Sequence, residues 1–426
     1  MNKPNGTASH QHLSGKTLGL LFLLALSVFI NYVDRGNLSV AAPLLKGELH
    51  LSASQLGVLL GAFFWTYTAL MIVAGWMVDR FNVSWVLAAG LVVWSIATVA
   101  TGLVNGFLTL LCFRMLLGVG ECVAFPAYGK ILAQHVSQQH RGIANGMIIC
   151  GMNLGPAVGT LICGGLMATY GWRPVFIFVG LGSLLWLLPW LRWMPRAAVT
   201  KERFICPATV GEILQRRAFW GAGIGHFCSN YAFYLLILWL PYYLVSERHL
   251  SMTQMARETA VFFVIYALGS PVVSWVADSR IRVGASANLV RKSSMAVGHL
   301  VVAAGILGLA AANVRTSFVF LIVMAIGSGF IGPNIYVFAQ TLAGPAVAGR
   351  WTGLQNCLGN LAGVVVGPLT GWVIDRTGHF WWAFVVAATI VVLGGASWVF
   401  LTGPLAQLRW PTEVLGEQKG SLPATV

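Results

Sequence analysis

Charged residues are scarce in this chain. Only 9% of its 426 residues are charged, and just 12 are acidic, whereas 57% are apolar. A typical globular domain carries roughly 25% charged residues. A soluble protein of this length could not cover its surface with so few charges, so most of the chain is expected to lie in lipid. The composition therefore predicts a membrane protein.

Several kinds of chemical site are also missing. The seven cysteines form no CxxC motif and no Cys/His cluster, so we expect neither a metal site nor a disulfide framework. The sequence has no Gly-x4-Gly-Lys-Ser/Thr loop for a nucleotide phosphate and no nucleophile–base constellation. We therefore expect no enzyme activity, including that of a membrane-embedded enzyme, and no cofactor.

Apolar runs of membrane-spanning length recur along the whole chain. A helix needs ~20 residues to cross the ~30 Å hydrocarbon core of a bilayer. Twelve runs satisfy this, near residues 18–42, 55–78, 83–103, 107–134, 142–168, 174–194, 218–245, 255–277, 294–312, 317–342, 352–374 and 380–402. The sequence therefore predicts an all-α membrane protein with twelve transmembrane helices.

Basic residues predict the orientation of these helices. Three of the 26 lie inside expected helices, namely Arg35, Arg114 and Lys130. With both termini on one side, six basic residues fall on the opposite side: Lys46, Arg173, Arg248, Arg257, Arg315 and Arg376. The remaining seventeen share the side of the termini. This bias predicts cytoplasmic termini in a plasma (inner) membrane. The net charge of +14 is thus an orientation signal, and we discount nucleic acid as a partner.

An internal repeat divides the chain into two halves. Three residues reappear 209 positions later, Gly118, Gly120 and Arg141 as Gly327, Gly329 and Arg350. Parallel six-helix halves produce such a repeat. The expected organisation is an N-terminal tail at 1–17, a first half at 18–194, a central cytoplasmic loop at 195–217, a second half at 218–402 and a C-terminal tail at 403–426.

Ionisable residues inside the expected helices are the main functional candidates. Each costs several kcal/mol in lipid unless it is paired or faces water. Asp34 and Glu121 face three bases, so full pairing leaves one cation that a substrate carboxylate could satisfy. A carboxyl group in an apolar setting also favours its protonated form, so these two acids are candidate proton carriers. Gly118 is expected to leave open space beside Glu121. The alternative is that the charges only pair to lock helices together.

Uncharged polar residues and glycines could complete such a cavity. The candidates are Asn31, Tyr32, Tyr67, Asn153, His226, Asn230, Tyr234, Asn334 and Asn356. Interhelical hydrogen bonds are the alternative role for each of them. Two series of small-xxx-small steps predict close helix contacts: Gly151, Gly155 and Gly159, and then Gly363, Gly367 and Gly371.

A short loop motif resembles the major facilitator superfamily. The segment Gly75-Trp-Met-Val-Asp79-Arg80 is similar to that family's Gly-x-x-x-Asp-Arg signature, and Ser274-Trp-Val-Ala-Asp278-Ser-Arg280 is a partial echo of it. The resemblance implies the two-half major facilitator fold. It also implies that Asp79, Arg80, Asp278 and Arg280 brace a cytoplasmic gate.

Two further segments resemble the anion:cation symporters of that superfamily, which include sugar-acid and organic-anion transporters. They are Asn31-Tyr-Val-Asp-Arg-Gly-Asn-Leu38 and Arg114-x6-Glu121-x3-Phe125-Pro-Ala127. The resemblance implies protonation at Asp34 and Glu121, with Arg114 modulating Glu121. It implies substrate contacts from Tyr32, Arg35, Tyr67 and Asn356. Asn153 and Asn334 occupy positions where the family pattern differs, and we expect them, as well as Arg114, to contact substrate too.

The sequence thus predicts a proton-coupled symporter for an organic anion such as a sugar acid, working by alternating access. Its expected partners are the anion, protons and the bilayer, and we expect a monomer. One alternative is a proton-coupled efflux antiporter, because Gly142-x8-Gly151-x3-Gly155-Pro156-x2-Gly159 is similar to a pattern of drug antiporters. A transport-inactive membrane sensor is the other.

Overall fold

Every regular element of the described chain is a helix. The structure is a computed structural model that describes residues 15–136, 141–194, 208–344 and 347–410. In chain order the elements are α1 Gly15–Glu48, α2 Ala53–Arg80, α3 Val83–Thr101, α4 Phe107–Glu121, α5 Ala124–His135, α6 Arg141–Tyr170, α7 Trp172–Leu185, α8 Leu187–Trp193, α9 Val210–Leu214, α10 Arg217–Ser246, α11 Met252–Arg282, α12 Ala287–Ala311, α13 Val314–Ala343, α14 Ala348–Thr377, α15 Phe380–Ala396 and the π-helical turn η2 Ser397–Leu401.

Twelve segments of the described chain are long and apolar enough to cross a membrane, which confirms the predicted number. Several extend beyond the expected edges, most clearly α1, which begins at Gly15 and ends at Glu48. Capping boxes fix where others begin. Ser52 caps α2 and Ser251 caps α11, each by accepting a hydrogen bond from the backbone three residues on. The expected all-α architecture is therefore the observed one.

The span expected as one helix over 107–134 is divided in two. Helix α4 ends at Glu121, and α5 begins at Ala124. Pro126 lies in the first turn of α5, where a missing backbone N–H is tolerated, whereas inside a continuous helix it would remove a hydrogen bond. The proline thus accounts for the break. Its consequence is that a buried acid is the last residue of a helix.

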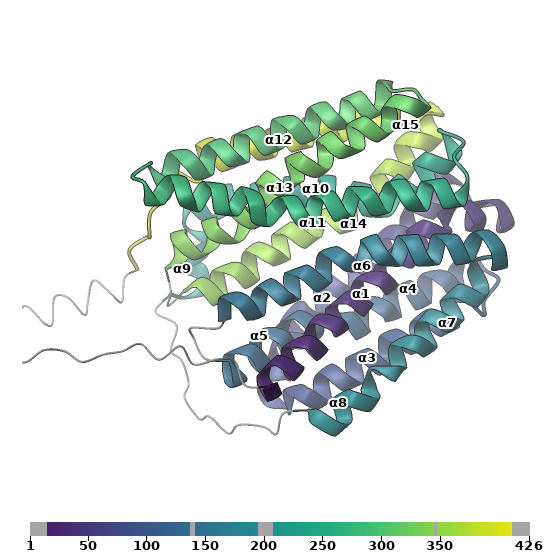
Figure 1. The fold of residues 1–426 in the computed structure, drawn as a ribbon, viewed down its shortest axis with the longest axis horizontal. Helices are drawn as coiled ribbons and strands as arrows, with labels where there is room; N and C mark the ends of the chain where they lie inside the picture. The colour runs from purple at the N-terminus through teal and green to yellow at the C-terminus, as the bar shows by residue number, and fades with distance from the viewer. Residues whose placement is uncertain (1–14, 137–140, 195–207, 345–346, 411–426) are drawn as a thin grey trace, which may run out of the picture.

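The helices form two groups that face each other. Figure 1 shows α1 to α8 together in purple to blue-teal and α10 to α15 together in teal to yellow. The groups meet where α2 packs on α14, α6 on α11 and α1 on α10. This is the expected arrangement of two six-helix halves.

Glycines set the closest contact between the halves. A side chain on Gly367 would lie 2.4 Å from the Gly57 carbonyl oxygen, and one on Gly371 would lie 2.3 Å from the Ala53 carbonyl oxygen. The predicted glycine series on α14 therefore brings its backbone against α2. The other series acts within the first half, because Gly151 and Gly155 pack against α1.

The tight contacts gather at one end of the bundle, which we call the far end, where α1 ends and α2 begins. There the Asp375 carboxylate at the end of α14 accepts hydrogen bonds from the Ala53 and Ser54 backbone N–H groups, at 2.9 and 2.7 Å. A negative charge at a helix N-terminus is favourable. Gly164 of α6 also meets Ala256 of α11 at this end. The two halves are thus joined at the far end.

We expect Gly367→Ala to loosen this contact. The added methyl group overlaps the α2 backbone, and overpacking of this kind costs about 1–3 kcal/mol. Electron–electron resonance between spin labels at two exposed far-end positions, Leu103 and Ala311, should show a longer mean distance. Gly165→Ala is the control, since a side chain there would meet no atom within 4 Å. Equal distance distributions in the two variants would contradict this account of the contact.

Candidate functional site

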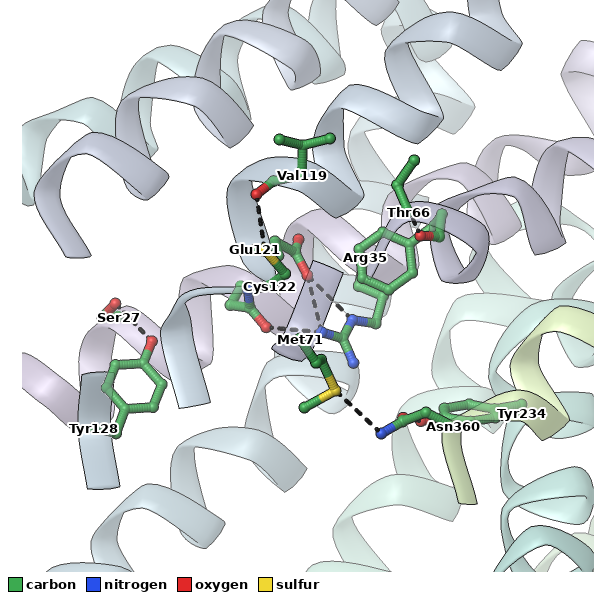
Figure 2. A network of polar contacts seen from close by, with 12 residues as sticks. Ser27, Arg35, Thr66, Met71, Val119, Glu121, Cys122, Tyr128, Tyr234 and Asn360 are labelled. Carbon is green, nitrogen blue, oxygen red and sulfur yellow. Dashed lines mark hydrogen bonds and ion pairs between the residues drawn. The ribbon is translucent and has the colours of Figure 1, made fainter. Parts of the chain in front are cut away.

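The centre of the site is a buried ion pair between Arg35 of α1 and Glu121 at the end of α4. The Arg35 Nη2 and Nε atoms donate to Glu121 Oε2 at 2.9 and 3.2 Å (Figure 2). Nη2 also donates to Asn31 Oδ1 at 3.2 Å. The side chains are 2% and 0% exposed. The structure therefore brings together two of the predicted residues, and it leaves Glu121 Oε1 without a hydrogen-bond partner among the described residues.

Three aromatic rings surround the Arg35 guanidinium. Its Cζ atom lies 4.5 Å from the centroid of the Tyr32 ring, 4.6 Å from that of Phe63 and 4.9 Å from that of Tyr67. A cation over an aromatic face is attracted by the ring quadrupole, more strongly when water is excluded. Tyr32 and Tyr67 were expected at the site, whereas Phe63 was not. The rings hold the guanidinium in place and leave its edge for anionic partners.

The second half supplies the facing wall. The Tyr234 ring of α10 packs at a tilt against the Phe64 ring of α2, with centroids 4.5 Å apart, and its hydroxyl donates to Asn360 Oδ1 of α14 at 2.6 Å. Asn360 Nδ2 in turn reaches Met71 Sδ of α2 at 4.0 Å (Figure 2). The site therefore lies between the halves, where a relative movement would change it.

Sequence reasoning missed two members of this wall. Asn360 is one. The other is Tyr266 of α11, which is linked to Tyr234 through Phe233, whose ring centroid lies 5.5 Å from that of Tyr234 and 6.2 Å from that of Tyr266. These residues are uncharged, so their presence in an apolar helix is not conspicuous. The available signal is their helical spacing, since Asn360 follows the predicted Asn356 by one turn and donates to its carbonyl oxygen at 2.9 Å.

Asp34 lies apart from the Arg35 pair although it precedes Arg35 in the chain. Neighbouring helix residues point in different directions, and Asp34 faces α7, where Ser183 Oγ lies 3.1 Å from its Oδ2 atom. Its side chain is 1% exposed. It still interacts electrostatically with Glu121 and Arg114. The two predicted proton-coupling residues are thus coupled through the protein, without sharing one hydrogen-bonded cluster.

Arg114 of α4 is a buried cation without an ion pair among the described residues. It is 2% exposed, and its Cζ atom is 5.7 Å from the centroid of the Phe63 ring. Its Nε and Nη2 atoms have no hydrogen-bond partner among the described residues. Arg114 interacts electrostatically with both Glu121 and Asp34. This position suits the predicted modulating role.

The expectation that Gly118 leaves open space beside Glu121 is wrong. A side chain at Gly118 would lie 2.4 Å from the Phe63 carbonyl oxygen of α2. The glycine lets the backbones of α4 and α2 approach each other, and it thereby holds Arg114 and Glu121 of α4 close to the aromatic residues of α2.

Asn334 lies elsewhere than expected. Its Oδ1 atom accepts a hydrogen bond from Arg291 Nη1 at 3.1 Å, and its Nδ2 atom donates to Ser294 Oγ at 2.9 Å. Arg291 also forms an ion pair with the predicted gating residue Asp278. Asn334 therefore belongs structurally with Asp278, and not with the Arg35 cluster.

Asp278 pairs with a residue that was not among the sequence candidates. Arg280 is exposed, whereas Arg291 is buried and makes the contact. Sequence analysis missed Arg291 because it placed this residue in a loop before a helix starting at 294, whereas α12 begins at Ala287. In the first half Arg80 is exposed, and the side chain of Asp79 lies outside the described residues.

The remaining candidates are Asn153 and Asn356. Asn153 of α6 is 6% exposed, and Asn356 of α14 is half-buried. Among the residues that the structure describes, no group of three His, Cys, Asp or Glu side chains could hold a metal ion. The charged centre of the described chain consists of arginines and carboxylates packed against aromatic rings.

We expect Glu121→Ala to destabilise the folded protein by about 3–5 kcal/mol, because it leaves the buried Arg35 charge unpaired. Unfolding of the purified protein in detergent measures this loss. Glu48→Ala is the matched control, because Glu48 pairs with Arg173 at 2.7 Å on side chains that are 46% and 29% exposed. Such a pair contributes less than about 1 kcal/mol. Similar losses in both variants would contradict the assignment of a desolvated ion pair.

Comparisons with known proteins agree with this architecture. A probable sulfoacetate transporter of Cupriavidus necator is 28% identical over 426 residues, covering 95% of this chain and 98% of that protein. The hexuronate transporter of Bacillus subtilis is 27% identical over 417 residues, and the match covers 95% of this chain and 97% of that transporter. Both relatives are transporters and not enzymes, as the sequence analysis expects.

The fold is also that of a solved transporter. A crystal structure of a bacterial homolog of the human lysosomal transporter Spinster, in an inward-facing and occupied conformation, superposes with a TM-score of 0.78 at 19% identity, covering 92% of this chain and 98% of that one. A family model described as the Major Facilitator Superfamily matches residues 24–366 and, in a second match, 222–420. The chain therefore belongs to the Major Facilitator Superfamily.

Proposed function

We propose that this protein is a proton-coupled symporter of an organic anion, such as a sugar acid or a related carboxylate. The observation that carries the proposal is the buried pair of Arg35 and Glu121, held among aromatic rings where the two halves meet. Two relatives are named for sulfoacetate and for hexuronate, and both compounds are organic anions. A site with a buried guanidinium suits such substrates.

Glu121 and the substrate carboxylate compete for the Arg35 guanidinium, and this competition couples proton binding to anion binding. Glu121 occupies the edge of Arg35 through two hydrogen bonds to a single carboxylate oxygen. A substrate carboxylate needs the same edge, because a guanidinium binds carboxylates through its paired N–H groups. Protonation removes the charge of Glu121 and weakens its hold, so the substrate binds Arg35 when Glu121 carries a proton. Proton and anion therefore travel together.

The other predicted residues take supporting roles in this proposal. Tyr32 and Tyr67 position Arg35 and offer hydroxyls to the substrate. Asn153 and Asn356 contact its polar groups from the two halves. Arg114 adjusts the proton affinity of Glu121 and Asp34 through its charge. Asp34 is the second proton-coupling residue.

Alternating access follows from movement of the halves, 18–194 and 218–402, about the central site. The far-end contacts between α2 and α14 close one side of the site. Asp79, Arg80, Asp278 and Arg280 brace the opposite, cytoplasmic gate, with Arg291 and Asn334 anchoring Asp278. We place both termini and the 195–217 loop in the cytoplasm of a cell whose plasma (inner) membrane holds the protein as a monomer.

Glu121→Gln should abolish accumulation driven by a pH gradient, because glutamine retains the shape of glutamic acid but carries no exchangeable acidic proton. Uptake of labelled D-glucuronate and sulfoacetate into proteoliposomes measures accumulation, and exchange without a gradient should persist. Glu48→Gln is the control for loss of an acid outside the site. Undiminished gradient-driven accumulation in the Glu121 variant would disprove the coupling role, and absence of any uptake by the unmodified protein would disprove the transport assignment.

A further inference from the structure

Ser183 of α7 forms a hydrogen bond with the buried Asp34 carboxyl. The serine side chain is 3% exposed, and its Oγ atom lies 3.1 Å from Asp34 Oδ2. The same Oγ atom lies 2.9 Å from the Val179 carbonyl oxygen one turn earlier in α7. Ser183 therefore has two possible hydrogen-bond acceptors within reach.

A serine hydroxyl has only one hydrogen to donate, but its oxygen can also accept. When Asp34 is ionised, its carboxylate is the stronger acceptor, so the Ser183 hydrogen points to Oδ2. When Asp34 is protonated, its own O–H can donate to Ser183 Oγ, and the Ser183 hydrogen can turn to the Val179 carbonyl. Both protonation states of Asp34 thus keep a hydrogen bond, without any movement of the backbone.

We propose that Ser183 is a positioning residue that sets the pH at which Asp34 exchanges its proton. The inference rests on the proposed role of Asp34 in proton coupling and adds a residue on another helix to it. A hydrogen bond to the ionised form favours that form. The hydrogen bond to the ionised carboxylate is charge-assisted and therefore stronger than the one to the protonated form, so the serine lowers the proton affinity of Asp34 relative to a site without this hydroxyl.

Asp34 has few other polar partners, so the Ser183 contact has a large influence on its carboxyl. The charged and titratable groups that interact with it are Glu121 and Arg114 of α4 and Cys163 of α6, and Arg35 is its neighbour on α1. No ion pair of Asp34 is formed within the described residues. The Thr98 side chain of α3 also interacts with the carboxyl, but Thr98 Oγ1 and Asp34 Oδ1 both lack a hydrogen-bond partner in the described chain. Ser183 is therefore the direct donor.

Infrared difference spectroscopy of the full protein in lipid tests the proposal, because the carbonyl stretch of a protonated carboxyl reports its titration directly. The band that disappears in Asp34→Asn belongs to Asp34. In Ser183→Ala the midpoint of this band should move to higher pH by about one unit, the equivalent of one lost hydrogen bond to a charged group. Ser183→Thr retains the hydroxyl and should titrate close to the unmodified protein.

Ser270 provides the matched control. It is 8% exposed and its hydroxyl donates to the Tyr266 carbonyl oxygen at 2.9 Å, one turn earlier, as Ser183 does with Val179. Ser270→Ala should leave the Asp34 midpoint unchanged. An unchanged midpoint in Ser183→Ala, or an equal shift in Ser270→Ala, would overturn the proposal.

Uptake into proteoliposomes separates this inference from the proposed function. If the unmodified protein shows no proton-driven uptake but the Asp34 midpoint moves in Ser183→Ala, the role of Ser183 stands and the transport proposal fails. If uptake is proton-driven and the midpoint does not move, the transport proposal stands and the role of Ser183 fails. If Ser183→Ala does not fold, the same titration is carried out on Ser183→Cys. Because a thiol is a weaker hydrogen-bond donor, the Asp34 midpoint should then move in the same direction by a smaller amount.

Discussion

The Arg35 guanidinium is held by one carboxylate and three aromatic rings, at a depth where water does not reach it. A charge in such a place must keep a partner, because an unpaired buried ion costs several kcal/mol. Glu121 meets this need in the structure, and in the proposed cycle a substrate carboxylate takes its place.

The helix break after Glu121 is part of that arrangement. Because α4 ends at this residue and α5 begins at Ala124, the carboxylate lies at the junction of two helices. Gly118 holds α4 against α2, whose Phe63 and Tyr67 rings cover Arg35. The second half touches the same cluster through Tyr234 and Asn360. Helices α2 and α14 therefore contribute both to the contacts at the far end and to the site.

Much of this could be predicted from the sequence, because lipid constrains a chain strongly. Hydropathy gives the twelve spans, and a charge within a span is conspicuous, so Asp34, Arg35, Arg114 and Glu121 were identified without a structure. The sequence did not show which residues pair. Arg35 and Glu121 are 86 residues apart, and Asp34 and Glu121 were equal candidates for the partner of Arg35. The anchor of Asp278 was missed for another reason, since the start of α12 was placed too late to include Arg291.

Proton uptake on anion binding tests the central claim most directly. Calorimetric titration of the purified protein with D-glucuronate and with sulfoacetate, in buffers of different ionisation enthalpy, measures protons bound per anion. If the anion displaces ionised Glu121 from Arg35, anion binding should be accompanied by uptake of up to one proton per anion, because the displaced carboxylate gains proton affinity. Glu121→Gln should remove this uptake. Binding of either anion without proton uptake, equal uptake in the variant, or binding of neither anion would contradict the account.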